Sequence, residues 1–301
     1  MYCRNYTPAE MMAIMTCKEF KDWEIVFVGI GIPLVAGILA KRFHAPHLTL
    51  VYESGCIGPE KMRVDFNVGD SSAADYALSL TSEWHVFGDL QCGFYDVGVL
   101  GAAQVDRYGN LNSTVIFNGD YYKPKVRLPG SGGGNDIGSS VGRVVVMMKL
   151  ERNRFVEKVD YLTTPGFLDG TPGARERVGL LGNGPSAVVT DKALFYFESK
   201  TREMYLDTIY PGVMVEDVKA SVGWDLKISE NLKTAPFPTE AELNALRAAD
   251  PANLIMGGAV ERKKLAGIDA YVDLTLNNAN RKSISELVMP KTSLLMQRTT
   301  N

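Results

Sequence analysis

The strongest constraint on the fold comes from an apolar stretch between residues 25 and 52. Ile25–Val28 is short and rich in β-branched residues, which is typical of a buried strand. A glycine turn follows, Pro33 opens a helix expected to continue to about residue 43, and residues 48–52 form a second strand. This order of strand, helix and strand predicts a βαβ unit with parallel strands and a right-handed crossover.

Part of this stretch could be mistaken for a membrane span. Residues 25–40 carry no charge over 16 positions, but a helix needs about 20 apolar residues to cross a bilayer. Gly29, Gly31 and Pro33 also interrupt the segment. We therefore expect a buried strand and helix here, and no association with a membrane.

Other apolar runs and capping patterns outline the rest of the fold. Thr7–Glu10 has the sequence of a capping box, which predicts a helix from about 8 to 20. Buried strands are expected at 97–100 and 144–148, a hairpin at 187–190 and 193–197, and a second capped helix that starts within 238–242 and runs to about 249. The sequence loses clear organisation after Met256, so we expect a main domain over 1–255 and a C-terminal extension of unknown role over 256–301.

Charge and cysteine usage exclude several classes of partner. The formal net charge is −3, which predicts no affinity for nucleic acid or other polyanions. The four cysteines, at positions 3, 17, 56 and 92, have no C-x-x-C spacing, so we expect no metal site and no redox pair. Together with an N-terminus that lacks a signal-peptide pattern, they indicate reduced thiols and a cytoplasmic location.

Common cofactor and nucleophile motifs are incomplete in this chain. Gly29 and Gly31 begin a dinucleotide-binding fingerprint, but its third glycine position holds Leu34. There is no G-K-[ST] sequence, so no P-loop is expected. Ser131 lies between two glycines, but Pro129 occupies the first glycine position of a nucleophile elbow. With only three histidines, the sequence also argues against a Ser-His-Asp hydrolase.

A glutamate at the end of the second strand is the first candidate for chemistry. Glu53 directly follows the strand at 48–52, and ligands of parallel α/β sheets bind beyond the carboxyl ends of strands. Ser54 and Gly55 come next, and glycine lets the backbone turn sharply and lets a ligand approach. Taken alone, this pattern favours a solvated turn glutamate over a catalytic one.

Two further segments favour a catalytic site. Gly130–Asn135 holds four glycines, and its bare backbone N–H groups can bind an anion or a developing oxyanion. A flexible surface connection is the plain alternative. Gly101–Asp106 ends an apolar strand with Gln104, a group suited to orienting an amide or a carbonyl, and an ordinary strand followed by an Asx turn is the alternative there.

These segments occur together in the family I coenzyme A transferases. From about residue 6 to about residue 255, the sequence resembles the β subunit of glutaconate CoA-transferase and its relatives. The resemblance rests on Val28–Leu34, Glu53–Gly55, Gly101–Asp106, Tyr108–Thr114, Gly130–Gly133, Lys158–Tyr161, Thr164–Gly170 and Val189–Lys192. It implies an α/β fold with an open, mostly parallel sheet flanked by helices and with irregular glycine-rich loops.

The resemblance also implies roles for individual residues. The family's nucleophile, the glutamate of the E-S-G stretch, falls on Glu53, and the family's oxyanion-stabilising loop falls on the backbone of Gly130, Gly132, Gly133 and Gly134. The residues that we regard as candidates for orienting the substrate are Ser54, Gly55, Gln104, Arg127 and Asn135.

The activity implied by the resemblance is transfer of CoA between an acyl-CoA and a free carboxylic acid. A carboxylate nucleophile suits a ping-pong mechanism through a glutamyl-CoA thioester, in which CoA and acyl-CoA are substrates and no cofactor is permanently bound. The intermediate needs protection from water, so we expect an α subunit to complete the acyl pocket. The assembly is expected to be a heterodimer or an α₂β₂ or α₄β₄ oligomer.

Two other functions remain compatible with the sequence. One is a CoA-ester hydrolase or decarboxylase on the same fold, which Cys56 leaves open because it lies close to Glu53; a small buried filler is the plainer interpretation of that thiol. The other is a non-catalytic regulatory or scaffolding subunit, against which Glu53 and the glycine loop both speak. The acyl substrate is indicated only through the resemblance, as a dicarboxylic or related acid. Arg127 fits a substrate carboxylate, a CoA phosphate or the plain surface equally well.

Overall fold

The computed structural model describes residues 1–60, 63–64, 70–120 and 122–257. The chain divides into two compact units, Met1–Ala249 and Asp250–Asn301. Most of the expected C-terminal extension, residues 258–301, lies outside the described residues.

The first unit contains seven α-helices and one short 3-10 helix among its described residues. They are α1 (Pro8–Cys17), α2 (Ile32–Phe43), η1 (Ser71–Ala74), α3 (Glu83–Gln91), α4 (Gly134–Ser140), α5 (Ala174–Arg177), α6 (Val215–Ala220) and α7 (Glu240–Ala249). The strands are β1 (Ile25–Phe27), β2 (Thr49–Val51), β3 (Cys56–Ile57), β4 (Ser79–Leu80), β5 (Val97–Leu100), β6 (Gln104–Val105), β7 (Leu111–Asn112), β8 (Val115–Ile116), β9 (Val126–Arg127), β10 (Arg143–Met147), β11 (Pro185–Val189), β12 (Ala193–Phe197), β13 (Met204–Ile209) and β14 (Lys227–Thr234).

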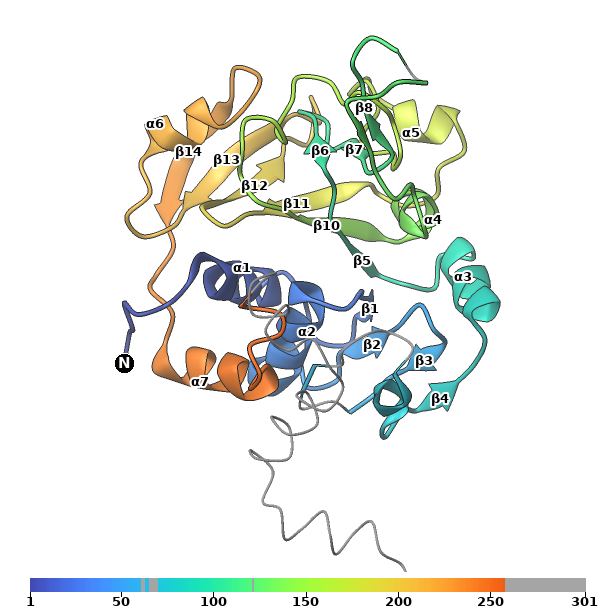
Figure 1. Ribbon diagram of the computed structural model, residues 1–301, viewed down its shortest axis with the longest axis vertical. Coiled ribbons are helices and arrows are strands. Elements are labelled where there is room, and N and C mark those ends of the chain that lie inside the picture. The colour runs from blue at the N-terminus through green and yellow to red at the C-terminus, as the bar shows by residue number, and fades with distance from the viewer. Residues whose placement is uncertain (61–62, 65–69, 121, 258–301) are drawn as a thin grey trace, which may run out of the picture. The chain divides into compact units, whose positions relative to one another are not determined.

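Ten of these strands form one sheet in the order β14-β13-β12-β11-β10-β5-β1-β2-β3-β4 (Figure 1). All neighbouring pairs from β11 to β2 are parallel. The antiparallel strands β12 and β13 extend one side of this central part, and β3 and β4 extend the other. The expected open, mostly parallel sheet is confirmed.

The predicted βαβ unit consists of β1, α2 and β2. The two strands pair in parallel, with Phe27 opposite Val51. The helix packs tightly on the second strand, since a Cβ on Gly37 would lie 2.8 Å from the Leu50 side chain. The unit therefore fixes where the chain leaves the sheet just before Glu53.

The helices cover both faces of the sheet. Figure 1 shows α1, α2 and α7 on one side and α4 and α5 on the other. The predicted capping box starts α1: Glu10 N–H donates to Thr7 Oγ1 (3.2 Å), and Thr7 N–H donates to Glu10 Oε2 (2.7 Å). Every residue from Glu10 to Cys17 is buried, as expected for a helix that is apolar on all sides and lies between α2, α7 and strands β10 and β11.

Some elements differ from the sequence-based expectation. The first helix ends at Cys17 rather than near residue 20, and the residues after it form turns in which Glu19 N–H donates to the Thr16 carbonyl. Strand β14 was not expected, because its residues are mostly polar and exposed at the edge of the sheet and no apolar run marks it. Among the described residues, no helix has both the length and the hydropathy that a bilayer crossing requires.

Candidate active site

Glu53 lies just beyond the end of β2, at a tight turn. Gly55 N–H donates to the Tyr52 carbonyl (3.0 Å), and Tyr52 N–H donates to the Cys56 carbonyl (2.8 Å). Gly55 has a φ of +103°, and a Cβ at this position would lie 1.9 Å from the Thr81 carbonyl oxygen. Only glycine fits both conditions. This turn therefore fixes the direction in which the half-buried Glu53 side chain leaves the sheet.

The glycine-rich loop lies against the Glu53 carboxylate. A Cβ on Gly133 would lie 3.6 Å from Glu53 Oε1 and 2.5 Å from the Phe87 ring. The backbone of Gly133 therefore occupies a space that no larger residue can share with Phe87. Two segments singled out from the sequence, at 53–55 and 130–134, meet here.

The backbone of this loop has the alternation of φ sign that occurs in anion-binding nests. Gly132 has a φ of +48° and Gly133 a φ of −76°, and such a change of sign aims successive N–H groups toward one point. The loop is held at both ends, because Gly130 N–H donates to the Ser113 carbonyl (2.9 Å) and Gly134 N–H to the Ser131 carbonyl (2.8 Å). Between these bonds, the N–H groups of residues 131–133 have no acceptor among the described residues. They are therefore available to a ligand.

Helix α3 forms one wall of the site. Glu83, Phe87 and Gln91 follow one another at intervals of four residues and so share one face of the helix. Phe87 contacts the glycine loop, and Gln91 Nε2 donates to Asp136 Oδ1 on α4 (2.8 Å). Burial and, secondarily, the negative charge of Glu83 raise the pKa of the Glu53 carboxyl group.

The other surface candidates lie at separate places. Ser54 is exposed in the turn after β2, and Asn135 is exposed on α4. Arg127 is exposed on β9, opposite Val115 of β8 and three residues before the glycine loop. The described geometry joins Ser54 and Asn135 to the segments that meet at the site, and Arg127 lies on the strand that leads into the glycine loop.

The Gln104 side chain is hydrogen-bonded to other residues of the fold. Its side chain is buried on β6, and its Oε1 accepts hydrogen bonds from Asn112 Nδ2 (2.7 Å) and from Asp160 N–H (3.1 Å). That oxygen is therefore engaged within the fold. The alternative interpretation, an Asx turn, describes this segment: Asp106 Oδ1 accepts the N–H groups of Tyr108 (3.0 Å) and Asn110 (3.1 Å).

Three residues near the site were not among the site candidates drawn from the sequence: Glu83, Phe87 and Thr164. Thr164 is buried, and a Cβ on Gly134 would lie 3.1 Å from its Oγ1. The four-residue spacing of Glu83 and Phe87 marks a helix face, but that spacing does not say what the face contacts. Only the packing of α3 and α4 brings these side chains to the loop.

A cavity of about 340 Å³ opens beside the Glu53 turn. It is lined by Ser54, Gly55, Cys56, Asp70, Ala73, Ala74, Leu80 and Thr81. Cys56 is buried, and its Sγ donates to the Ala73 carbonyl (3.0 Å), which fits the interpretation of this thiol as a filler. Within the part of the chain that the structure describes, no group of three or more His, Cys, Asp or Glu side chains could hold a metal ion.

Comparison with known proteins decides the family. The family model for Coenzyme A transferase matches residues 9–221. The chain belongs to the coenzyme A transferase family. It is 40% identical over 246 residues to one of the subunits of the 3-oxoadipate CoA-transferase of Pseudomonas knackmussii, covering 81% of this chain and 94% of that protein.

One of the subunits of the glutaconate CoA-transferase of Acidaminococcus fermentans is also 40% identical over 246 residues, with coverage of 79% of this chain and 91% of that protein. The crystal structure of glutaconate coenzyme A-transferase from the same organism superposes with a TM-score of 0.78 at 38% identity, over 85% of this chain and 99% of that one. These findings confirm the resemblance, the fold and the assignment to the CoA-transferases that were drawn from the sequence.

Proposed function

We propose that this chain is the nucleophile-bearing subunit of a CoA-transferase and that Glu53 carries CoA as a glutamyl thioester. The observation that carries the proposal is the position of Glu53 Oε1 beside Gly133, where a Cβ built on the glycine would lie 3.6 Å from that oxygen. The neighbouring N–H groups of residues 131–133 have no acceptor among the described residues. A nucleophile and an oxyanion-stabilising nest are thus adjacent.

The reaction proceeds by two exchanges at the same carboxylate. The Glu53 carboxylate attacks the acyl-CoA carbonyl carbon, and the C–S bond breaks to leave a mixed anhydride and CoA thiolate. The thiolate attacks the glutamyl carbonyl of the anhydride, which releases the first carboxylic acid as its carboxylate and leaves the glutamyl-CoA thioester. A second carboxylate then reverses these steps and leaves with CoA, and Glu53 is regenerated.

Each exchange passes through a tetrahedral oxyanion. Donors aimed at such an oxygen are worth about 10²–10³ in rate for each well-placed group. The N–H groups of residues 131–133 supply these donors without reorganisation, because bonds to Ser113 and Ser131 already hold the loop. Glu83 and burial also support the nucleophile, since a raised pKa makes the Glu53 carboxylate more basic.

The dependence of activity on pH tests the role of Glu83. A raised pKa means that Glu53 takes up a proton, and loses its nucleophilic form, at a higher pH than an ordinary glutamate. Removing the Glu83 charge removes one of the two causes, so Glu83→Gln is expected to lower this pKa and to move the acid limb of the kcat/KM profile to lower pH. Asp89→Asn on the same helix is the control, because that carboxylate acts on Tyr95 and should leave the limb in place. An unmoved limb in Glu83→Gln would show that the two carboxylates are not coupled.

The surface next to the site favours a partner subunit. Tyr76, Leu78 and Leu80 lie between β3 and α3, Trp84 lies at the start of α3, and each is at least 65% exposed. Leu80 also lines the cavity beside the Glu53 turn. Exposed apolar side chains clustered at a site mark protein contacts. We propose that an α subunit covers this surface and excludes water from the thioester.

The proposed substrate class follows from the names of the similar proteins. The 3-oxoadipate and glutaconate CoA-transferases are named for dicarboxylic acids. We propose that this enzyme also moves CoA to or from a dicarboxylic acid. Arg127 remains a candidate for the second carboxylate or for a CoA phosphate.

Peptide mass spectrometry tests the covalent step directly. The complex with its α subunit is incubated with an acyl-CoA and no acceptor acid, and is then reduced with borohydride. We expect the peptide that contains Glu53 to lose mass, because reduction of a thioester converts the side-chain carboxyl to an alcohol. The chain without its partner should not show this change, because it lacks the completed acyl pocket.

Other outcomes of this experiment point to other functions. Consumption of the acyl-CoA with an unmodified Glu53 peptide would indicate the hydrolase or decarboxylase alternative. Full modification and turnover by the isolated chain would contradict the proposed partner. No consumption by any complex, together with tight binding of the partner, would favour a non-catalytic subunit.

A further inference from the structure

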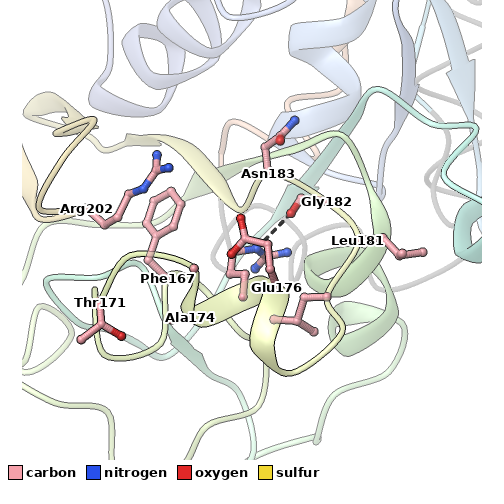
Figure 2. A pocket seen from close by; sticks show the side chains of 11 residues that line it. Phe167, Thr171, Ala174, Glu176, Leu181, Gly182, Asn183 and Arg202 are labelled. Atoms are coloured by element: carbon pink, nitrogen blue, oxygen red, sulfur yellow. Dashed lines mark hydrogen bonds between the residues drawn. The ribbon is translucent and has the colours of Figure 1, made fainter.

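Arg175 is a buried cation that bonds only to backbone oxygens. It is 5% exposed and lies on α5. Its Nε donates to the Gly182 carbonyl (3.0 Å), the bond drawn to Gly182 in Figure 2, and its Nη1 donates to the Gly166 carbonyl (2.8 Å) and the Pro165 carbonyl (3.2 Å). Its Nη2 donates to the Gly138 carbonyl on α4 (3.0 Å). No carboxylate of the described chain forms an ion pair with it.

These bonds provide hydrogen-bond donors for backbone carbonyls at the C-terminal end of α4. The last carbonyls of a helix lack partners within the helix, and a cation there also interacts favourably with the helix dipole. Arg175 donates a hydrogen bond to the Gly138 carbonyl. The Ser139 carbonyl accepts hydrogen bonds from the N–H groups of Leu181 (2.9 Å) and Gly182 (3.1 Å). The segment that contains Arg175 therefore clamps this end of α4.

The other end of α4 begins at the anion-binding nest. Gly133 immediately precedes the helix and lies beside Glu53, since a Cβ on this glycine would be 3.6 Å from Glu53 Oε1. Thr164, next to the Pro165 carbonyl that Arg175 holds, packs against α4 so closely that a Cβ on Gly138 would lie 2.2 Å from its Cγ2. Arg175 thus fixes both α4 and the segment on which α4 rests.

We infer that Arg175 is a positioning residue for catalysis: it holds α4 and the Pro165–Gly166 segment so that the nest at 131–133 points at the reacting carbonyl of Glu53. The inference rests on the proposed function of Glu53. A guanidinium is needed because its planar fork reaches three separate backbone segments at once, which an ammonium group does not. Displacement of a catalytic group by about 1 Å costs about 10²-fold in rate.

The test compares Arg175→Ala and Arg175→Lys in the αβ complex. We expect kcat to fall about 10²-fold in Arg175→Ala, with the KM for acyl-CoA changed less than about twofold, because the nest acts on the transition state and not on ground-state binding. Arg175→Lys should recover only a small part of kcat. Millimolar guanidinium should restore activity to Arg175→Ala, because truncation extends the existing cavity of about 140 Å³ beside Arg175.

Arg202 provides a matched control. It lines the same cavity but is exposed, with its guanidinium over the Phe167 ring at 5.1 Å, so Arg202→Ala should keep kcat. The inference is overturned if Arg175→Ala keeps the wild-type kcat. It is also overturned if the loss of kcat matches the loss of folded protein measured by circular dichroism and guanidinium restores no activity. If Arg175→Ala does not fold, Arg175→Lys tests the inference instead. A fall in kcat with little change in KM would support it, and an unchanged kcat would overturn it.

Borohydride labelling of the wild-type complex separates this inference from the proposed function. A wild-type complex with no label on Glu53 refutes the thioester mechanism, and with it the stated task of Arg175. A labelled wild type with an unaffected Arg175→Ala refutes only the role of Arg175.

Discussion

Replacement of Glu53 by glutamine is expected to abolish CoA transfer. The amide keeps the shape of the side chain but cannot form the anhydride, and loss of a covalent nucleophile lowers kcat by roughly 10⁴–10⁶. Glu53→Asp keeps the carboxylate but withdraws it by one methylene from the nest at Gly133, so it should retain a small activity. Initial rates of CoA transfer in the αβ complex, with borohydride labelling, measure both effects.

The stability of Glu53→Gln distinguishes lost chemistry from lost folding. Burial and Glu83 raise the pKa of Glu53 in the folded state. Stability from such a group is fully present below its unfolded-state pKa and is lost as the pH rises through the folded-state pKa. At neutral pH the ionised carboxylate is therefore unfavourable, and Glu53→Gln should melt at the same temperature as the wild type or higher. A lower melting temperature would contradict this account.

A surface glutamate gives the control for this substitution. Glu60, whose side chain is 61% exposed, forms an ion pair with the largely buried Lys41 at 3.0 Å. Glu60→Gln should change the free energy of unfolding by no more than about 1 kcal/mol. It should leave the transfer rate unchanged. A comparable loss of activity in both variants would remove the special role of Glu53.

Gly133→Ala is expected to have the second largest effect. The new Cβ would lie 2.5 Å from the Phe87 ring, so either the loop or the ring must move. Movement of the loop takes its N–H groups away from the oxyanion, and kcat should fall about 10²-fold or more. Steady-state kinetics should show this loss in kcat, with a smaller change in KM.

Two variants show whether the steric clash between the new Cβ and the Phe87 ring causes the loss of kcat. Gly88→Ala on α3 is a matched control, because no atom lies within 4 Å of the added Cβ and its φ is ordinary; it should keep activity and gain about 0.5–1 kcal/mol in stability. The double variant Gly133→Ala with Phe87→Leu removes the ring that the new methyl group meets. It should recover part of kcat, so the two substitutions should not be additive. Strict additivity would show that Gly133 does not act through Phe87.

Several features of this protein could be predicted from local sequence alone. The apolar runs of 25–52, with the glycine turn and Pro33 between them, identified the βαβ unit, and the capping box at Thr7–Glu10 placed the start of α1. The order of the E-S-G and glycine-rich stretches indicated the family. Such signals are encoded within a few consecutive residues, by backbone preference and by which side chains avoid water.

The tertiary structure alone decided which of these segments meet. The proximity of Glu53 and Gly133 depends on the strand order β10-β5-β1-β2 and on the packing of α3 against α4. Packing also brings Glu83 and Phe87 to the site, and it places Arg175 at the C-terminal end of α4. Gln104 shows the converse, since its strand-end position favoured a ligand but folding engaged its oxygen with Asn112. Contacts between residues far apart in sequence arise from crossovers and side-chain packing, which the periodicity of one segment does not encode.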